Sequence, residues 1–160
     1  MALGDMFLRL ESQRGGLVKG ESTDAAHPQE IHVIDWSWGM TSSPMMGGKG
    51  GAVKTALSEL HIHKRADSST TALMSVMRTN DLIKKAVLSV RKAGGKQIDY
   101  LTIAIERGRI TSYEINSQSE VGPHIVEHLT LTFEKIDISY YTQDEKGERK
   151  GGSNFVTEIV

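Results

Sequence analysis

Apolar and polar residues alternate along several stretches of the chain, and this period of two is typical of half-buried β-strands. In the clearest stretch, residues 100–106, Leu101, Ile103 and Ile105 share one face. The same kind of pattern predicts further strands at 6–11, 31–38, 110–115, 128–134, 136–140 and 154–160. The chain is therefore expected to be mainly β.

Two irregularities interrupt this alternation. Gly108, between Arg107 and Arg109, predicts a bend or bulge, because a glycine inside a strand pattern often marks one. Farther along, the apolar positions have odd numbers up to Phe133 and even numbers from Ile136 onward. A slip of one residue exchanges the two faces of a strand, so we expect a β-bulge near residues 134–135.

One helix is expected to begin just after residues 67–69, whose side-chain oxygens can cap its free N–H groups. Leu73, Val76 and Met77 follow at the spacing of one helical face, and the helix is expected to end near residues 79–80. One helix with seven to nine strands predicts a β-sandwich or barrel.

The segment 81–92 fits two patterns. A helical stripe would use Leu82, Ile83, Ala86, Val87 and Val90, whereas a strand would use Leu82, Ala86, Leu88 and Val90. Periodicity alone leads us to expect a helix here and leaves the strand open.

Residues 37–51 lack either period and are rich in glycine and methionine. A loop of this length inside a compact domain is uncommon and is often functional, and methionine adapts well to contact surfaces. We therefore expect a contact loop, and the alternative is a hairpin tip with no partner.

The composition of the chain narrows the classes of function that are possible. The 160 residues carry 38% hydrophobic and 24% charged residues, as one globular domain does, and 19 basic against 20 acidic residues give a net charge of −1. This balance argues against a nucleic-acid partner and permits self-association. The absence of cysteine excludes disulfides, cysteine-ligated zinc and thiol catalysis. We expect no signal peptide and no membrane insertion, and hence folding in the cytoplasm.

Motifs that carry chemistry are missing or incomplete. The glycine-rich stretch 47–55 lacks the Gly-Lys-Ser/Thr order of a phosphate-binding loop. His61 and His63 have a spacing that zinc can use, but a third ligand is needed, and no pattern brings His124 or His128 near them. We expect no catalytic residues, no metal, no cofactor and no enzymatic activity.

Two other classes of function remain as alternatives. Trp36, Trp38 and Tyr113 could form a stacking platform in a small ligand- or carbohydrate-binding β-sandwich module. A hydrolase could use His61 or His63.

Five segments, taken together and in order, resemble the haemolysin-coregulated protein family, the tube subunits of type VI secretion systems. They are residues 5–10, 31–39, 61–67, 83–95 and 129–136. The resemblance implies a two-sheet β-barrel with one packed α-helix, similar to phage tail-tube proteins, over a single domain at 1–160. It also implies that 82–92 is a strand pairing with 100–106 across a turn at residues 94–95.

The same resemblance implies a function. Six copies would close into a ring, and rings would stack into a hollow tube with a spike protein at its tip and a contractile sheath and baseplate around it. Small effector proteins would be carried in the lumen, and contraction would eject the tube from the cell without a signal peptide. The region at about 37–51 would contact another subunit or ring. The expected contact residues are Trp38, Met40, Pro44, Met45, Met46 and Lys49.

Overall fold

The computed structural model describes residues 5–43, 54–92, 98–118, 124–146 and 148–159. The first half of the chain contains β1 (Asp5–Ser12), β2 (Gly16–Val18), β3 (Ile31–Ser37), β4 (Met40–Ser43), β5 (Lys54–Leu57), β6 (Leu60–Arg65) and α1 (Thr70–Arg78). The second half contains β7 (Ile83–Arg91), β8 (Asp99–Gly108), β9 (Ile110–Gln118), β10 (His124–Leu131), β11 (Lys135–Gln143) and β12 (Arg149–Glu158).

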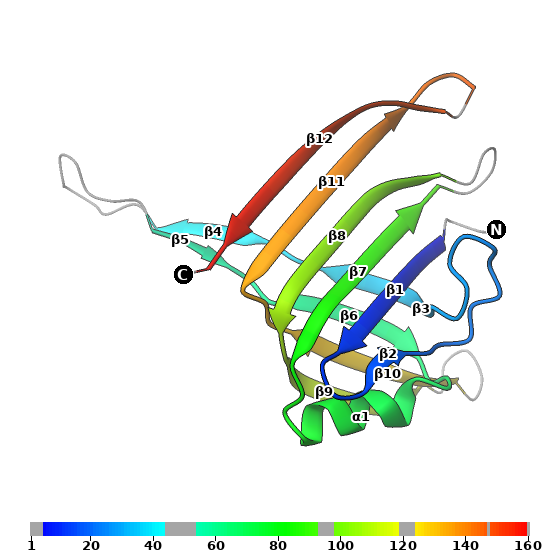
Figure 1. Cartoon of the computed structure of the whole chain (residues 1–160), viewed down its shortest axis with the longest axis vertical. Helices are drawn as coiled ribbons and strands as arrows, with labels where there is room; N and C mark the ends of the chain where they lie inside the picture. Colours follow the sequence, from blue (N-terminus) through cyan, green and yellow to red (C-terminus); the bar gives the residue numbers. More distant parts are fainter. Residues whose placement is uncertain (1–4, 44–53, 93–97, 119–123, 147, 160) are drawn as a thin grey trace.

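Two layers of antiparallel strands cross each other over a common core (Figure 1). One layer has the order β12-β11-β8-β7-β1, and the other has the order β3-β6-β10-β9. The layers are joined where β1 pairs with β3, and the short β2 pairs with β1 alone. The strands β4 and β5 form a separate hairpin that extends beyond the two layers (Figure 1).

The prediction of a mainly β fold with one helix is confirmed, but the barrel needs a correction. The strands follow an open path with β12 at one end and β9 at the other, and no pairing among the described residues joins these ends. Both end strands therefore carry an unpaired edge within the described chain. The sequence could not predict this, because alternation shows which side chains share a face and not which strands meet.

The ambiguous segment 81–92 contains a strand, so the helix expected from periodicity is wrong. β7 pairs with β1 on one edge and with β8 on the other, for example through Leu88, which is opposite Leu8 and Ile103. The four residues from Leu88 to Arg91 are all buried. A strand covered on both faces has consecutive buried positions, and this obscured the period of two.

The expected bulge at 134–135 is also wrong. β10 ends at Leu131 and β11 begins at Lys135, and the two strands belong to different layers. The change of phase therefore marks a crossing of the chain between layers. The bend predicted at 107–109 is a second crossing, between β8 and β9, with a positive φ of 53° at Arg107.

The two crossings lie against each other. The N–H of Thr132 donates to the Arg109 carbonyl at 2.9 Å, and the N–H of Arg109 donates to the Thr132 hydroxyl at 3.1 Å. A Cβ on Gly108 would lie 2.0 Å from the carbonyl oxygen of Thr132, so only glycine allows this approach.

The core lies between the layers. Ile103 and Ile105 of the predicted apolar face are buried, whereas Leu101 is half-buried. Their buried partners from the other strands include Leu8, Leu10, Ile31, Leu60, Ile62, Ile83, Leu88, Leu131 and Ile136.

The helix α1 has the expected extent, and Leu73 and Val76 face the core. Ser69 occupies the N-cap position without a capping bond from its side chain, and Asp67 accepts a hydrogen bond from the Ser69 N–H at 2.9 Å. Asn80, at a φ of 53°, follows the end of the helix.

A fully buried ion pair anchors this helix to the second layer. Lys64 on β6 contacts Glu127 on β10, and its ammonium also donates to Asp67 at 3.1 Å. Thr70, the first residue of α1, donates to Glu127 at 3.0 Å. The Tyr113 hydroxyl donates to the same carboxylate, and burial followed by this bond raises the pKa of Tyr113.

Candidate assembly surfaces

The strand β12 is almost uncovered by the rest of the chain. Nine of its ten residues are exposed, and among the described strands it pairs only with β11. Phe155 is 42% exposed and Val156 is 46% exposed. Because adjacent side chains of a strand point to opposite faces, apolar surface is exposed on both sides of β12.

The other end of the strand path is also open. β9 pairs only with β10 among the described strands, and most of its residues are exposed, including the apolar Ile115. On the neighbouring β10, Ile125 is half exposed. The subunit thus presents two different strand edges, and edges of this kind are templates for pairing with another chain.

The hairpin β4–β5 is a third uncovered element (Figure 1). All four residues of β4 are exposed, and Met40 is 53% exposed. At its base, Ser58 fixes Gly39 by two hydrogen bonds of 2.8 Å. A two-stranded hairpin alone is marginally stable in water, so an outside contact would favour its order.

The expected contact residues lie partly in this hairpin. Met40 is the first residue of β4, and Trp38 lies just before it, half-buried against the core. The Trp38 indole nitrogen is buried, and no described residue accepts a hydrogen bond from it. Pro44, Met45, Met46 and Lys49 lie outside the described residues. The expected loop at 37–51 thus begins with the end of β3 and the strand β4.

The histidines considered for zinc form a different arrangement. His63 is directly opposite His128 on the neighbouring strand, and their rings stack at 4.1 Å with an angle of 9°. Burial, and then the charge of His128, lowers the pKa of His63. Parallel rings direct their lone pairs side by side rather than toward a common ion. Among the described residues, no three His, Cys, Asp or Glu side chains could hold a metal.

The aromatic residues considered for sugar binding do not form one platform. Trp36 on β3 and Trp38, just after this strand, are packed against the core, whereas Tyr113 lies on β9, and β6 and β10 lie between β3 and β9. The Tyr113 hydroxyl is directed at the buried Glu127. The sequence did not identify β12 or β9 as surfaces, although adjacent apolar residues at 155–156 were a usable signal.

Comparison of the sequence with known proteins identifies a family and a relative. The family model described as type VI secretion system effector, Hcp, matches residues 7–140. Protein hcp1 of Pseudomonas aeruginosa is 37% identical over 151 residues, covering 92% of this chain and 90% of that protein.

Solved structures agree as well. One described as a type six secretion system protein superimposes with a TM-score of 0.86 at 21% identity, over 98% of this chain and 96% of that one. Hcp1 from Salmonella typhimurium superimposes with a TM-score of 0.78 at 21% identity, over 99% and 96%. The carbohydrate-binding alternative is not favoured. The chain therefore belongs to the Hcp family, the tube subunits of type VI secretion systems.

Proposed function

We propose that copies of this chain close into a six-membered ring by head-to-tail contact, and that the rings stack into the secretion tube. The observation that carries this proposal is β12, a ten-residue strand with apolar side chains exposed on both faces. In a monomer these apolar side chains stay in water, whereas a neighbouring subunit that covers the strand would bury them.

Head-to-tail contact needs two unlike surfaces on each subunit, and the ring closes only if the rotation between neighbours returns to the start. The two ends of the strand path, β12 and β9, are unlike surfaces of this kind. A net charge of −1 leaves little repulsion between copies.

We assign the region at about 37–51 to contact with another subunit or ring, within one tube-subunit domain at 1–160. The exposed Met40 and the half-buried Trp38 support this role at the base of the hairpin. Pro44, Met45, Met46 and Lys49 would extend the same contact.

Further partners follow from the proposed tube. A spike protein would occupy its tip, a sheath and baseplate would surround it, and small effector proteins would travel in its lumen. Assembly would take place in the cytoplasm, and contraction of the sheath would release the protein from the cell. No nucleic acid, membrane insertion, cofactor or catalytic step is part of this role.

No helix in the described part of the chain combines the length and hydropathy needed to cross a membrane.

The ring is tested by light scattering and negative-stain electron microscopy on the same purified sample. We expect six-fold rings with a central hole and a mass of about six times 17.6 kDa. A monodisperse 17.6 kDa monomer at micromolar concentration would contradict spontaneous ring closure.

The role of β12 is tested by Val156→Asp, which places a charge on exposed apolar surface. We expect loss of the ring with the fold retained, as measured by circular dichroism. Leu17→Asp on β2 is the matched control, because Leu17 is an exposed apolar residue away from both end strands. Equal ring formation by both variants would show that β12 is not part of the interface.

The contact region is tested by deleting residues 45–51. We expect the fold to be retained and the closure or the stacking of rings to be weakened. Tubes of wild-type length would show that the assignment is wrong.

A further inference from the structure

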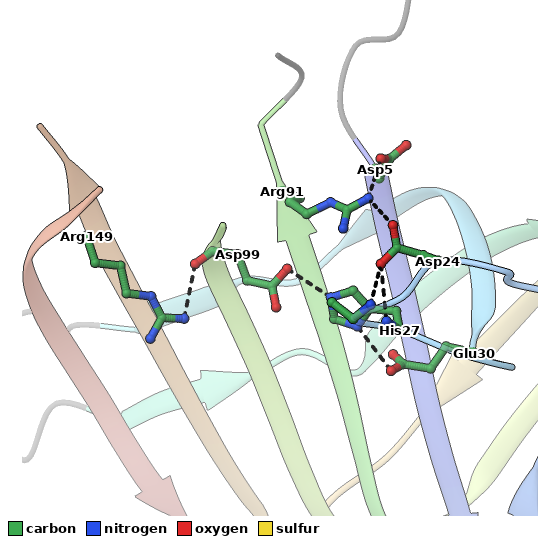
Figure 2. A network of polar contacts seen from close by, with 8 residues as sticks. Asp5, Asp24, His27, Glu30, Arg91, Asp99 and Arg149 are labelled. Carbon is green, nitrogen blue, oxygen red and sulfur yellow. Dashed lines mark hydrogen bonds and ion pairs between the residues drawn. The ribbon is translucent and has the colours of Figure 1, made fainter. Parts of the chain in front are cut away.

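The buried side chain of His27 lies between two carboxylates. Its Nδ1 is 3.0 Å from Glu30 Oε2 and its Nε2 is 3.0 Å from Asp99 Oδ1 (Figure 2). The imidazole is 8% exposed and stacks on the ring of Phe7, with centroids 4.4 Å apart and an angle of 12°. His27 therefore connects the segment 19–30, which joins β2 to β3, with the start of β8.

This geometry favours a proton on both ring nitrogens. An ionised carboxylate only accepts hydrogen bonds, and a neutral imidazole has one donor and one acceptor nitrogen. In the neutral form, one nitrogen lone pair would face a carboxylate oxygen at 3.0 Å in a poorly hydrated site. The imidazolium satisfies both contacts at once.

The surrounding charges also favour the imidazolium. Arg91 of β7 donates to Asp5 of β1 and to Asp24 of the segment itself, each at 2.7 Å. Arg149 of β12 reaches the Asp99 carbonyl at 3.4 Å, and on β3 the ring of His32 lies against Phe7. The charged and titratable groups around His27 are thus Asp5, Asp24, Glu30, His32, Arg91, Asp99 and Arg149.

Loss of the His27 proton would leave four carboxylates with Arg91 as the one buried cation beside them among the described residues. We propose that His27 is a proton-dependent latch, which holds the segment 19–30 against β8 when charged and releases it when deprotonated. The bond to Asp99 is the one that matters, because it joins residues 72 positions apart, whereas Glu30 is a local partner.

The direction of the pH effect follows from linkage. Burial lowers the pKa of His27, but the hydrogen bonds to Asp99 and Glu30 outweigh it and hold the pKa above 6.5. A group with a raised pKa contributes its full stabilisation below the unfolded value and loses it as the pH rises through the folded value. The latch is therefore closed at pH values below the ordinary histidine pKa and opens as the pH rises through the raised pKa of His27.

Amide hydrogen exchange on the full-length protein reports directly on whether the latch is closed. The N–H groups of Gly20, Ser22 and Gln29 donate within the segment at 2.7, 3.1 and 2.8 Å. After correction for intrinsic exchange, we expect their protection to fall as the pH rises through the raised pKa of His27. The fall should be about tenfold for each unit by which the folded pKa exceeds the unfolded one. The amide of the core residue Leu88 should not follow this fall.

Two variants separate His27 from the other histidines. His27→Gln should have low protection in the segment at every pH, whereas His63→Gln should retain the wild-type pH dependence, because the pKa of His63 is lowered and not raised. Loss of the pH dependence in His63→Gln, or its persistence in His27→Gln, would overturn the proposal.

A titration of the wild-type His27 ring by NMR needs no variant. An imidazolium at pH 6.5 that titrates above this value supports the latch, and a neutral ring at pH 6.5 overturns it. Because these measurements report on one subunit, they decide the latch whether or not the ring assembly is correct.

Discussion

The strands β7 and β12 belong to the same layer and have similar lengths, yet their environments are opposite. β7 is paired on both edges, and most of its residues are buried or half-buried. β12 is paired on one edge, and its neighbouring apolar residues Phe155 and Val156 are exposed on opposite faces. Adjacent apolar positions thus stabilise the fold of the subunit in one strand and are available for assembly in the other.

Local contacts stabilise β12 without a core. A Cβ on Gly152 would lie 2.8 Å from Tyr141 Cδ1, so glycine makes room for this ring on β11. The guanidinium carbon of Arg149 lies 4.1 Å from the centre of the same ring. The strand can therefore be ordered in the monomer while its surfaces stay free.

The largest loss of stability is expected when the buried ion pair of Lys64 and Glu127 is broken, because both side chains lie in the core. Glu127→Leu leaves the ammonium of Lys64 buried with only Asp67 as a charged partner. Loss of one member of a buried pair costs about 3–5 kcal/mol, and urea denaturation should show a decrease of this size in the free energy of unfolding.

The double variant Lys64→Met with Glu127→Leu is the control. It should recover part of the lost stability, because the two charges of the pair are removed together, although Asp67, which is 11% exposed, loses its ammonium partner. A single variant as stable as the wild type would mean that the pair is hydrated in solution.

The contrast between β7 and β12 is tested by truncating one side chain in each of these strands. Leu88→Ala on β7 should lower the free energy of unfolding by about 2–5 kcal/mol, since it leaves a cavity in the core. Phe155→Ala on β12 should change the stability of the monomer by only about 0.5 kcal/mol, but it should reduce the population of rings in light scattering. If the two variants lose equal amounts of monomer stability, β7 and β12 do not differ in their contribution to the fold of the subunit.

The smallest effect is expected at Arg149. Arg149→Met keeps the apolar stem but removes the cation over Tyr141, which contributes about 0.5–1 kcal/mol. Thermal unfolding should show a small decrease, and Arg149→Lys should restore part of it. If both variants unfold like the wild type, the contact does not stabilise β12.

Much of the fold could be predicted from local patterns. Alternation predicted the strands at 6–11, 31–38 and 100–106, and the helix α1 has the expected extent. The errors lie where more than one face of a strand is covered or where the chain changes layers. Periodicity favours a helix at β7 for the first reason, although the family resemblance implies the strand. Periodicity also places residues 132–134 in a bulged strand for the second reason.

The candidate surfaces were only partly predictable. The length and composition of the region at 37–51 predict a contact loop, and this role stays a prediction; Met40 is exposed there. The alternation at 154–160 predicted a last strand, but neither the exposure of both faces of β12 nor the cluster around His27 was predicted, because these depend on which segments meet. His27 and Asp99 are 72 positions apart, and His63 stacks on a histidine that no local pattern placed nearby.

By itself, the sequence determined which residues alternate, where the helix lies, and the family resemblance carried by its segments. The tertiary structure decided the order of the strands, the two crossings between layers and the exposure of β12. The physical reason is that periodicity records which side chains share a face of one element. Whether that face is covered by the same chain, by another copy or by water depends on contacts between residues far apart in the sequence.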